Sequence, residues 1–311
     1  MKIVFFGSGK IAIPSLDSLI KNNDVACVVT APDKKKGRHL PISFTPIKEF
    51  ALKKELNIFQ PEDILAKQSI EYLKKLNADV FIVFSFGKIL SRDLLDIPKL
   101  FALNIHASLL PKYRGAAPIN QALINGEEKT GITIIKMNEK MDEGNILLRK
   151  GIGIDYSDNV LTLEEKISKL AAKSLQEALY KINQNEIRLI KQEDKEASYA
   201  PKLKKEDGRI NWNKQAHQIR NQIRGCLPWP GAFTFYKSTM LKIWDAEVIN
   251  EIQKKDKCLS GTIISLDKKG ILVATKEGFL LIKELQSSSG RRLSAWQFIQ
   301  GHKFVIGSKL D

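Results

Sequence analysis

The stretch MKIVFFGSGKIAIPSL, residues 1–16, decides how the fold begins, because an apolar run leads directly into a glycine-rich turn. We predict a buried strand from Lys2 to Phe6 and a helix from Ala12 to Ile20, entered at Pro14, whose fixed φ suits a first helical turn. The turn between them, Gly7 to Ala12, matches the G-x-G-x-x-A form of the dinucleotide-binding fingerprint. A strand, a glycine turn and a helix in this order predict the first unit of an open α/β sheet.

The cofactor that this turn suggests is NAD, and its fingerprint also needs an acidic residue about twenty positions further on to hold a ribose. The second apolar run, VACVVT, ends at Thr30 without such a residue. The nearest one, Asp33, lies beyond Pro32 and is followed directly by three lysines. Two interpretations of this turn therefore stay open: a dinucleotide site, or a tight turn that needs small residues.

The first half of the chain alternates short apolar runs with segments of helical spacing, a pattern typical of a parallel α/β sheet. We predict buried strands at KIVFF, VACVVT, ADVFIVFSF and ALNIHAS, and helices at FTPIKEFALKKELN and PEDILAKQSIEYLKKLN. TGITIIKM and GNILLRKGIGI follow as strands, and the long amphipathic helix after them has Thr162 and Glu165 in capping-box spacing. These patterns predict an α/β domain with a Rossmann-like, mostly parallel sheet over residues 1–187.

A second domain is predicted after a polar stretch. Polarity rises over residues 188–207, which we interpret as a linker. The segment NKQAHQIRNQIRGCLPWPGA then predicts a helix that ends at its first glycine. Five short strands follow, from AFTFY to FLLIKELQ, and Ser294 and Gln297 are placed to cap a final helix. Residues 208–311 are therefore predicted to form a small, OB-like β-barrel domain.

The net charge of +15 is the first functional hint, because it attracts phosphate-rich or other acidic partners. Residues 201–311 carry 20 Lys and Arg against 10 Asp and Glu, so they hold +10 of that charge. A general compositional bias towards lysine would give the same excess. Nucleic-acid binding and a merely basic surface therefore both stay open.

Cysteine content and hydropathy bear on where the protein works. Cys27, Cys226 and Cys258 are odd in number and too scattered for a disulfide framework or a zinc site. The chain starts with a strand rather than a secretory leader, and no apolar run approaches the ~18 residues of a membrane span. We expect a soluble, cytoplasmic protein with no membrane partner, and a monomer.

The segment LFALNIHASLLPKYRGAAPINQAL, residues 100–123, is the most informative part of the chain. In its strand, Asn104, His106 and Ser108 share one face, because alternate side chains of a strand point the same way. A parallel strand covered by helices should be apolar on both faces. Polar residues at its carboxyl end fit a ligand site, since open α/β sheets bind ligands there. The alternative is a core histidine satisfied by a backbone carbonyl.

An acidic turn at residues 138–144, NEKMDEG, follows the strand TGITIIKM. An aspartate in this turn could face His106, fix its tautomer and stabilise its protonated form, whereas the other reading is a solvated turn without a catalytic role. We find neither a nucleophile elbow nor a catalytic-cysteine context, and the histidines at 39, 106, 217 and 302 form no metal-ligand pattern. Asn, His and Asp without a nucleophile suggest direct transfer between two bound substrates.

Ser108 to Ile119, SLLPKYRGAAPI, together with Asn104-Ile105-His106, resembles the signature of methionyl-tRNA formyltransferases. The resemblance extends over nearly the whole chain, through APDKKKGR, TGITIIKMNEKMDEGNIL, YAPKLKKEDGRINW and LPWPGAF. Its Asn-x-His and Ser-Leu-Leu-Pro core is shared by users of 10-formyltetrahydrofolate and specifies the superfamily alone. The segment Leu227-Pro228-Trp229-Pro230 narrows the resemblance to the branch that acts on tRNA.

The resemblance implies formyl transfer from 10-formyltetrahydrofolate to the α-amino group of methionyl-initiator tRNA, with no metal and no NAD. It implies a catalytic set of Asn104, His106 and Asp142. The implied folate site is lined by Ser108, Leu109, Leu110 and Pro111 and by Phe86, Gly87, Lys88 and Ile89. The implied tRNA contacts are basic side chains: Lys34, Lys35, Lys36, Arg38, Lys202, Lys204, Lys205, Arg220, Arg224, Arg291 and Arg292.

Two departures from the family pattern concern loops. Gly7-Ser8-Gly9 stands where relatives usually have Gly-Thr-Pro, and His39-Leu40-Pro41 stands where many have further basic residues. We expect the opening loop, Gly7 to Lys10, to be architectural and to border the methionyl end of the tRNA. Three rival functions stay open: a formyltransferase or formyltetrahydrofolate hydrolase that acts on a small molecule, a nicotinamide-dependent oxidoreductase, and a pure RNA-binding module.

Overall fold

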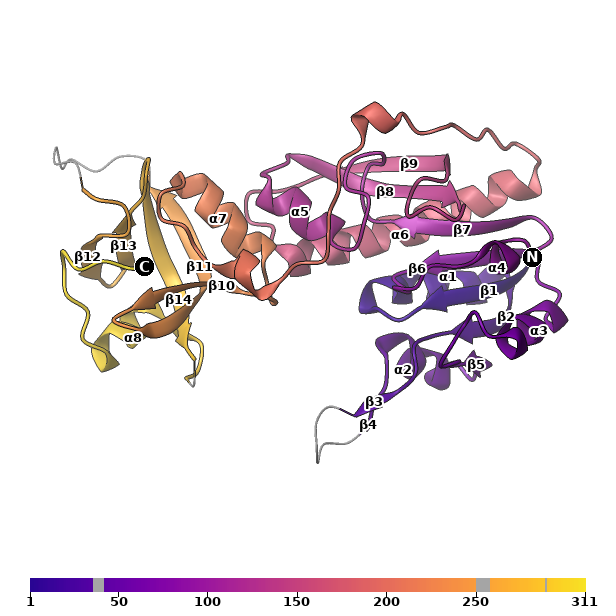
Figure 1. Cartoon of the computed structure of the whole chain (residues 1–311), viewed down its shortest axis with the longest axis horizontal. Coiled ribbons are helices and arrows are strands. Elements are labelled where there is room, and N and C mark those ends of the chain that lie inside the picture. Colours follow the sequence, from indigo (N-terminus) through magenta and orange to yellow (C-terminus); the bar gives the residue numbers. More distant parts are fainter. Residues whose placement is uncertain (36–41, 250–257, 289) are drawn as a thin grey trace. The chain divides into compact units, whose positions relative to one another are not determined.

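The chain folds into two compact units, whose elements are labelled in Figure 1. The computed structural model describes residues 1–35, 42–249, 258–288 and 290–311. The first unit holds Met1–Pro118, Lys129–Gly153 and Glu164–Pro201, and the second holds Ile119–Glu128, Ile154–Leu163 and Lys202–Asp311.

A seven-stranded sheet forms the centre of the first unit, with the order β5-β2-β1-β6-β7-β8-β9. The first five strands in this order are parallel, whereas β8 and β9 run antiparallel at one edge. The Rossmann-like, mostly parallel sheet predicted from the alternating pattern is confirmed. The strands are β1 (Lys2–Gly7), β2 (Asp24–Val29), β5 (Ile58–Phe59), β6 (Val80–Phe84), β7 (Phe101–His106), β8 (Lys129–Lys136) and β9 (Asn145–Gly153).

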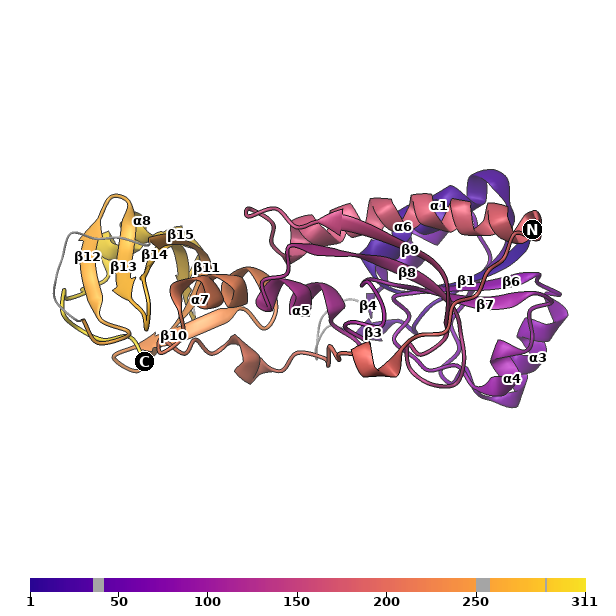
Figure 2. The same cartoon turned by 90° about the horizontal axis from the view of Figure 1, so that it is seen from above.

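Helices cover both faces of this sheet, with α1 and α6 on one face and α3 and α4 on the other (Figure 2). On the α3 and α4 side, the fully buried rings of Phe6 and Phe81 lie 5.1 Å apart, and burying one such side chain contributes roughly 1.5–3 kcal/mol. Pro14 lies in the first turn of α1, as predicted. The other elements described before residue 202 are η1 (Lys10–Ala12), α1 (Ile13–Asn22), β3 (Lys34–Lys35), β4 (Ile42–Ser43), α2 (Pro46–Lys53), α3 (Lys67–Lys75), α4 (Arg92–Leu95), α5 (Pro118–Ile124), α6 (Val160–Asn183) and η2 (Asp194–Glu196).

Helix α6 begins at Val160, before the predicted cap. Asn159 caps it, because its Oδ1 accepts from the backbone N–H groups of Leu161 and Thr162 at 2.8 and 3.2 Å. Thr162 Oγ1 accepts from the Asn159 N–H at 3.0 Å and so fills the reciprocal position of a capping box. The predicted box of Thr162 and Glu165 is therefore wrong. An earlier asparagine caps at least as well as threonine and lengthens the helix.

The opening turn is held by the loops beside it. The N–H groups of Ser8 and Gly9 donate to Ser85 O at 3.0 and 3.4 Å. Ser8 Oγ lies 3.2 Å from Thr30 Oγ1, which lies 2.8 Å from Thr45 Oγ1. A Cβ on Gly9 would collide with the Ser85 side chain, so the close approach of two loops accounts for this glycine. At the strand end where the fingerprint requires a ribose-binding carboxylate, the chain has the buried Thr30 hydroxyl.

An antiparallel sheet forms the centre of the second unit, with the order β10-β11-β14-β13-β12 and with β15 paired to β14. Its apolar side chains pack with Ile219 of α7 and Phe298 of α8 in one core. Ser294 Oγ accepts from the Gln297 N–H at 3.2 Å, which confirms the predicted cap. The predicted barrel-like second domain is confirmed. Its elements are η3 (Lys205–Gly208), α7 (Ala216–Gly225), β10 (Ala232–Tyr236), β11 (Thr239–Ile249), β12 (Ile263–Asp267), β13 (Gly270–Ala274), β14 (Phe279–Ser287), β15 (Leu293–Ser294) and α8 (Ala295–Gly301).

Candidate active site

Asn104 and His106 lie on β7, the last parallel strand before the sheet turns antiparallel. Asn104 is opposite Val83 of β6, and His106 is opposite Thr133 of β8. Asn104 is half-buried and His106 is only 5% exposed. Buried polar groups need partners, so the contacts of these two side chains define the site.

Asp142 is the shared partner of both side chains. Asn104 Nδ2 donates to Asp142 Oδ1 at 3.1 Å, and His106 Nδ1 lies 3.4 Å from Asp142 Oδ2. The Gly115 N–H donates to the same Oδ2 at 2.9 Å. Asp142 has a φ of +57°, in the left-handed region that few non-glycine residues adopt. The loop between β8 and β9 thus brings the three predicted catalytic side chains together.

The hydrogen-bond partners of His106 indicate which ring nitrogen carries a hydrogen. Tyr113 O lies 2.8 Å from His106 Nε2, and a carbonyl oxygen only accepts, so these partners assign a hydrogen to Nε2. Nδ1 is left facing the Asp142 carboxylate, and a proton on it makes the two side chains an ion pair. The predicted alternative of a histidine satisfied by a backbone carbonyl is therefore confirmed. The ring also lies beside Asn104 and Asp142, and a ligand site at this cluster stays a prediction.

The first predicted folate segment, Ser108 to Pro111, is fixed mainly through Thr133. Ser108 Oγ donates to a backbone carbonyl at 2.6 Å, so this hydroxyl already has a partner. Thr133 Oγ1 donates to Ser108 O at 2.7 Å and accepts from the Leu110 N–H at 3.0 Å. Ser108, Leu110 and Pro111 are buried, whereas Leu109 is half-buried. A ligand would therefore meet Leu109 and the backbone rather than the serine hydroxyl.

The second predicted folate segment follows β6, the strand next to β7. The Phe86 ring packs in the core, 5.5 Å from that of Phe6, whereas Gly87, Lys88 and Ile89 are exposed. Gly87 has a φ of +75°, which glycine adopts without strain. Because β6 and β7 are parallel, the two predicted folate segments follow neighbouring strand ends at one edge of the sheet.

Residues 190–200, from the stretch interpreted as a linker, belong to the first unit and contact its loops. Ile190 and Ile146 exchange two backbone hydrogen bonds, of 2.7 and 2.9 Å. Ser198 Oγ accepts from the Tyr113 N–H at 2.9 Å. This strap, as we call residues 190–200, thereby holds the segment whose carbonyl accepts from His106.

Two buried polar residues of this region had no role in the sequence analysis. Arg114 is 2% exposed and Gln192 is 5% exposed. Arg114 Nε and Nη2 donate to Gln192 Oε1 at 3.1 and 2.9 Å, and Nη2 also donates to Asp194 Oδ1 at 2.9 Å. Arg114 lies inside the signature run, whose two charged residues are Lys112 and Arg114, so its charge was a visible signal. Gln192 lies in a polar stretch, where no pattern distinguishes it.

The described residues contain no group of three or more His, Cys, Asp or Glu side chains placed to hold a metal ion. Burial raises the pKa of Cys27 to about 11 and that of Cys226 to about 12, which disfavours the thiolate needed for nucleophilic attack. Among the helices in the described part of the chain, none is long and apolar enough to span a membrane.

Comparison with known proteins shows which family the chain belongs to. Residues 1–179 match the family described as formyl transferase, and residues 202–303 match its C-terminal domain. Methionyl-tRNA formyltransferases of Caldanaerobacter subterraneus subsp. tengcongensis and Caldicellulosiruptor saccharolyticus are 43% and 44% identical to the chain, over 100% of each sequence. That of Staphylococcus aureus strain MW2 is 42% identical over 99% of each sequence. The chain belongs to the methionyl-tRNA formyltransferase family.

Solved structures share the fold of this formyltransferase. The sugar 3N-formyl transferase WlaRD, crystallised with dTDP and 5-N-formyl-THF, has a TM-score of 0.68 at 22% identity and covers 94% of this chain and 99% of its own. The N-formyltransferase of Helicobacter canadensis, in complex with folinic acid and dTDP-3-aminofucose, has a TM-score of 0.66 at 20% identity over 94% and 100%.

The predicted tRNA-contacting residues of the formyltransferase lie in both units. Lys34 is exposed on β3, Lys35 lies on the same strand, and Lys36 and Arg38 fall outside the described residues. Arg292 is exposed and its Nε donates to a glutamate of β14 at 2.7 Å. The other exposed residues of the predicted set are in the second unit: Lys202, Lys204, Lys205 and Arg291.

Arg220 and Arg224 share one face of α7, and this face packs within the second unit. The Arg220 guanidinium stacks 3.5 Å from the centre of the Tyr156 ring, and its Nη2 donates to Tyr156 O at 2.6 Å. Arg224 Nη1 donates to the carbonyls of Asp155 and Asp158, both at 3.3 Å. Both arginines are half-buried, so the structure gives them local partners.

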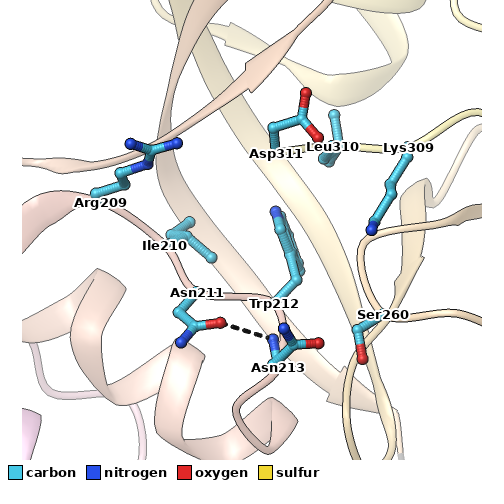
Figure 3. Close-up of a pocket in the computed structure, with 9 residues that line it drawn as sticks. All are labelled: Arg209, Ile210, Asn211, Trp212, Asn213, Ser260, Lys309, Leu310 and Asp311. Carbon is cyan, nitrogen blue, oxygen red and sulfur yellow. Dashed lines mark hydrogen bonds between the residues drawn. The ribbon is translucent and has the colours of Figure 1, made fainter.

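A cavity of about 320 Å³ opens in the second unit of the formyltransferase (Figure 3). It is lined by residues 209–213 and 309–311 together with Ser260. Its lining carries two cations, Arg209 and Lys309, and none of the predicted catalytic or folate-binding side chains. The candidate active site is therefore the cluster of Asn104, His106 and Asp142 rather than this cavity.

Proposed function

We propose that Asn104, His106 and Asp142 form the reacting set that transfers the formyl group of 10-formyltetrahydrofolate to the α-amino group of methionyl-initiator tRNA. The observation that carries this proposal is the contact of an amide and an imidazole with one carboxylate, at 3.1 and 3.4 Å. This set has a hydrogen-bond donor, Asn104, and a side chain that can accept and return a proton, His106, but it has no activated nucleophile. It suits direct attack of one bound substrate on the other.

The acceptor amine must lose a proton before it attacks. A free α-amine has a pKa of about 7.7–8.0, so it is largely protonated near neutral pH. Attack forms the new C–N bond and moves the carbonyl electron pair onto the formyl oxygen. Asn104 has a second amide hydrogen beyond the one bonded to Asp142, and this donor stabilises the oxyanion. Removing a donor of this kind costs roughly 2.7–4 kcal/mol in other enzymes.

The proton that the amine gives up returns to the folate. When the tetrahedral species collapses, the bond between the formyl carbon and N10 breaks, and N10 takes a proton. Histidine suits the intermediate storage of that proton, because it titrates close to neutral pH. Since Nε2 of His106 is bonded to Tyr113 O and Nδ1 faces Asp142, the proton passes through the Asp142 carboxylate, whose side chain is 11% exposed.

The folate occupies the edge of the sheet where β6 and β7 end. Residues 87–89 are exposed there, and Leu109 is half-buried beside the end of β7. Two structural neighbours bind 5-N-formyl-THF or folinic acid, which supports a formylated folate as the donor. The acceptor stem is held largely by phosphate contacts to the second unit, whose segment 202–311 has a net charge of +10.

One transfer assay tests the proposal against its rivals. The purified protein is incubated with formyl-labelled 10-formyltetrahydrofolate and with methionyl-initiator tRNA, uncharged tRNA, free methionine or no acceptor. We expect label only on the methionyl-tRNA. Label on free methionine, or folate hydrolysis without an acceptor, would replace the proposed function with that of a small-molecule formyltransferase or a hydrolase.

A further inference from the structure

We propose that Gln192 and Arg114 are positioning residues that hold Asp142 in its reactive geometry. The inference rests on the proposed function, because it assumes that the Asp142 carboxylate takes part in formyl transfer. Neither residue belongs to the set that faces the substrates: Arg114 and Gln192 are buried and bonded to protein groups. Their effect on the reaction would therefore pass through Asp142.

Gln192 holds the backbone on both sides of Glu143, the residue that follows Asp142. Its Nε2 donates to Asp142 O at 2.7 Å and to Gly144 O at 2.8 Å. Both hydrogens of the amide are thus used on one short turn. Asp142 needs such support, because a non-glycine residue at a φ of +57° persists only where its surroundings over-determine it.

Arg114 fixes which way the Gln192 amide points. Two guanidinium nitrogens donate to Gln192 Oε1, so a flipped amide would set its NH₂ group against a cation. The guanidinium charge is balanced by Asp194 at 2.9 Å and by Glu143, whose Oε1 lies 3.6 Å from Nη1. Because Glu143 follows Asp142 in the chain, Arg114 holds the same turn by a second route.

The clamp formed by Gln192 and Arg114 matters because the Asp142 carboxylate serves three groups at once. Oδ1 accepts from Asn104, and Oδ2 accepts from the Gly115 N–H while facing His106 Nδ1. A small rotation of the backbone would weaken all of these interactions together. Because both clamp residues are buried and bonded to protein groups, we expect neither to contact folate or tRNA. Loosening the clamp should therefore lower kcat and leave both KM values nearly unchanged.

The decisive variant is Gln192→Glu, which keeps the size of the side chain and the bond to Arg114 but removes both donors to the turn. We expect kcat to fall by about 10–100-fold, as for other groups that orient a reacting residue, with both KM values within about twofold. The matched control is Gln222→Glu in the second unit. Gln222 is also buried, and its Nε2 donates to the carbonyls of Asp207 and Arg209 at 2.7 and 2.9 Å. We expect this variant to keep its kcat.

A double mutant separates positioning from general damage to the fold. If Gln192 acts through Asp142, the Gln192→Glu/Asp142→Asn protein turns over no more slowly than Asp142→Asn alone. Fully additive losses, or an unchanged kcat in Gln192→Glu while Asp142→Asn is impaired, would overturn the inference and leave the proposed function standing. Full activity of Asp142→Asn would overturn the catalytic role itself. If Gln192→Glu does not fold, Arg114→Lys gives the same comparison, because lysine keeps the charge and gives up the double hold on Oε1.

Discussion

One amide hydrogen of Asn104 is bonded to Asp142, and in the proposed mechanism the other stabilises the oxyanion. We predict that Asn104→Ala lowers kcat by about 10²–10³-fold, because one preorganised donor is removed. Binding of methionyl-tRNA, measured by filter retention, should stay near that of the parent. Asn57→Ala is the matched control, since Asn57 is an exposed asparagine beside β5. A decrease in Asn104→Ala no larger than in this control would remove the donor role.

The three cysteines differ in burial, which predicts their reactivity. Burial raises the pKa of Cys27 to about 11 and that of Cys226 to about 12, whereas Cys258 is half-buried. Because only the thiolate reacts, we predict that an excess of a disulfide reagent at pH 8 modifies Cys258 alone in the native protein and all three thiols after denaturation. Rapid modification of Cys27 or Cys226 in the native protein would contradict the described cores.

At the scale of elements, strong periodicity made the fold predictable. β1 and β6 are nearly continuous apolar runs, and their strand assignments hold. β5 has two residues and carries no period, so it was missed. The antiparallel direction of β8 and β9 depends on the path of the chain between strands, and the composition of the strands does not encode that path.

Part of the site was predictable from the same kind of pattern. Asn104 and His106 are polar residues in an otherwise apolar strand, so they were visible in the sequence. Gln192 lies in a polar stretch that indicates only a linker.

The start of α6 offers a quantitative test of its observed cap. Asn159→Ala removes the side chain that accepts from two backbone N–H groups, so we predict a decrease of about 1 kcal/mol in the free energy of unfolding. Glu165→Ala should change it by less than about 0.5 kcal/mol, because Glu165 is exposed and lies outside the cap. Urea unfolding followed by circular dichroism measures both. The reverse order would restore the box of Thr162 and Glu165.

The exposed positive charge of the enzyme predicts how its tRNA binding depends on salt. Lys202, Lys204 and Lys205 are exposed at the start of the second unit's longest segment. We predict that replacing all three with alanine weakens tRNA binding and lowers the slope of log K against log salt by about 0.7–0.9 for each phosphate that is no longer neutralised. Folate affinity should not change. Replacing the exposed Lys67, Lys74 and Lys75 of α3 removes the same charge, and an equal effect there would show that net charge alone is responsible.

The variant His106→Ala tests whether the cluster of Asn104, His106 and Asp142 performs formyl transfer. The measurement is the single-turnover rate of formyl transfer to methionyl-initiator tRNA, with folding checked by circular dichroism and tRNA affinity measured in parallel. We predict a rate lower by orders of magnitude with nearly unchanged tRNA affinity, because the proton store between Tyr113 and Asp142 is gone. A folded His106→Ala protein that transfers the formyl group at close to the parent rate would rule out a role of His106 in the transfer.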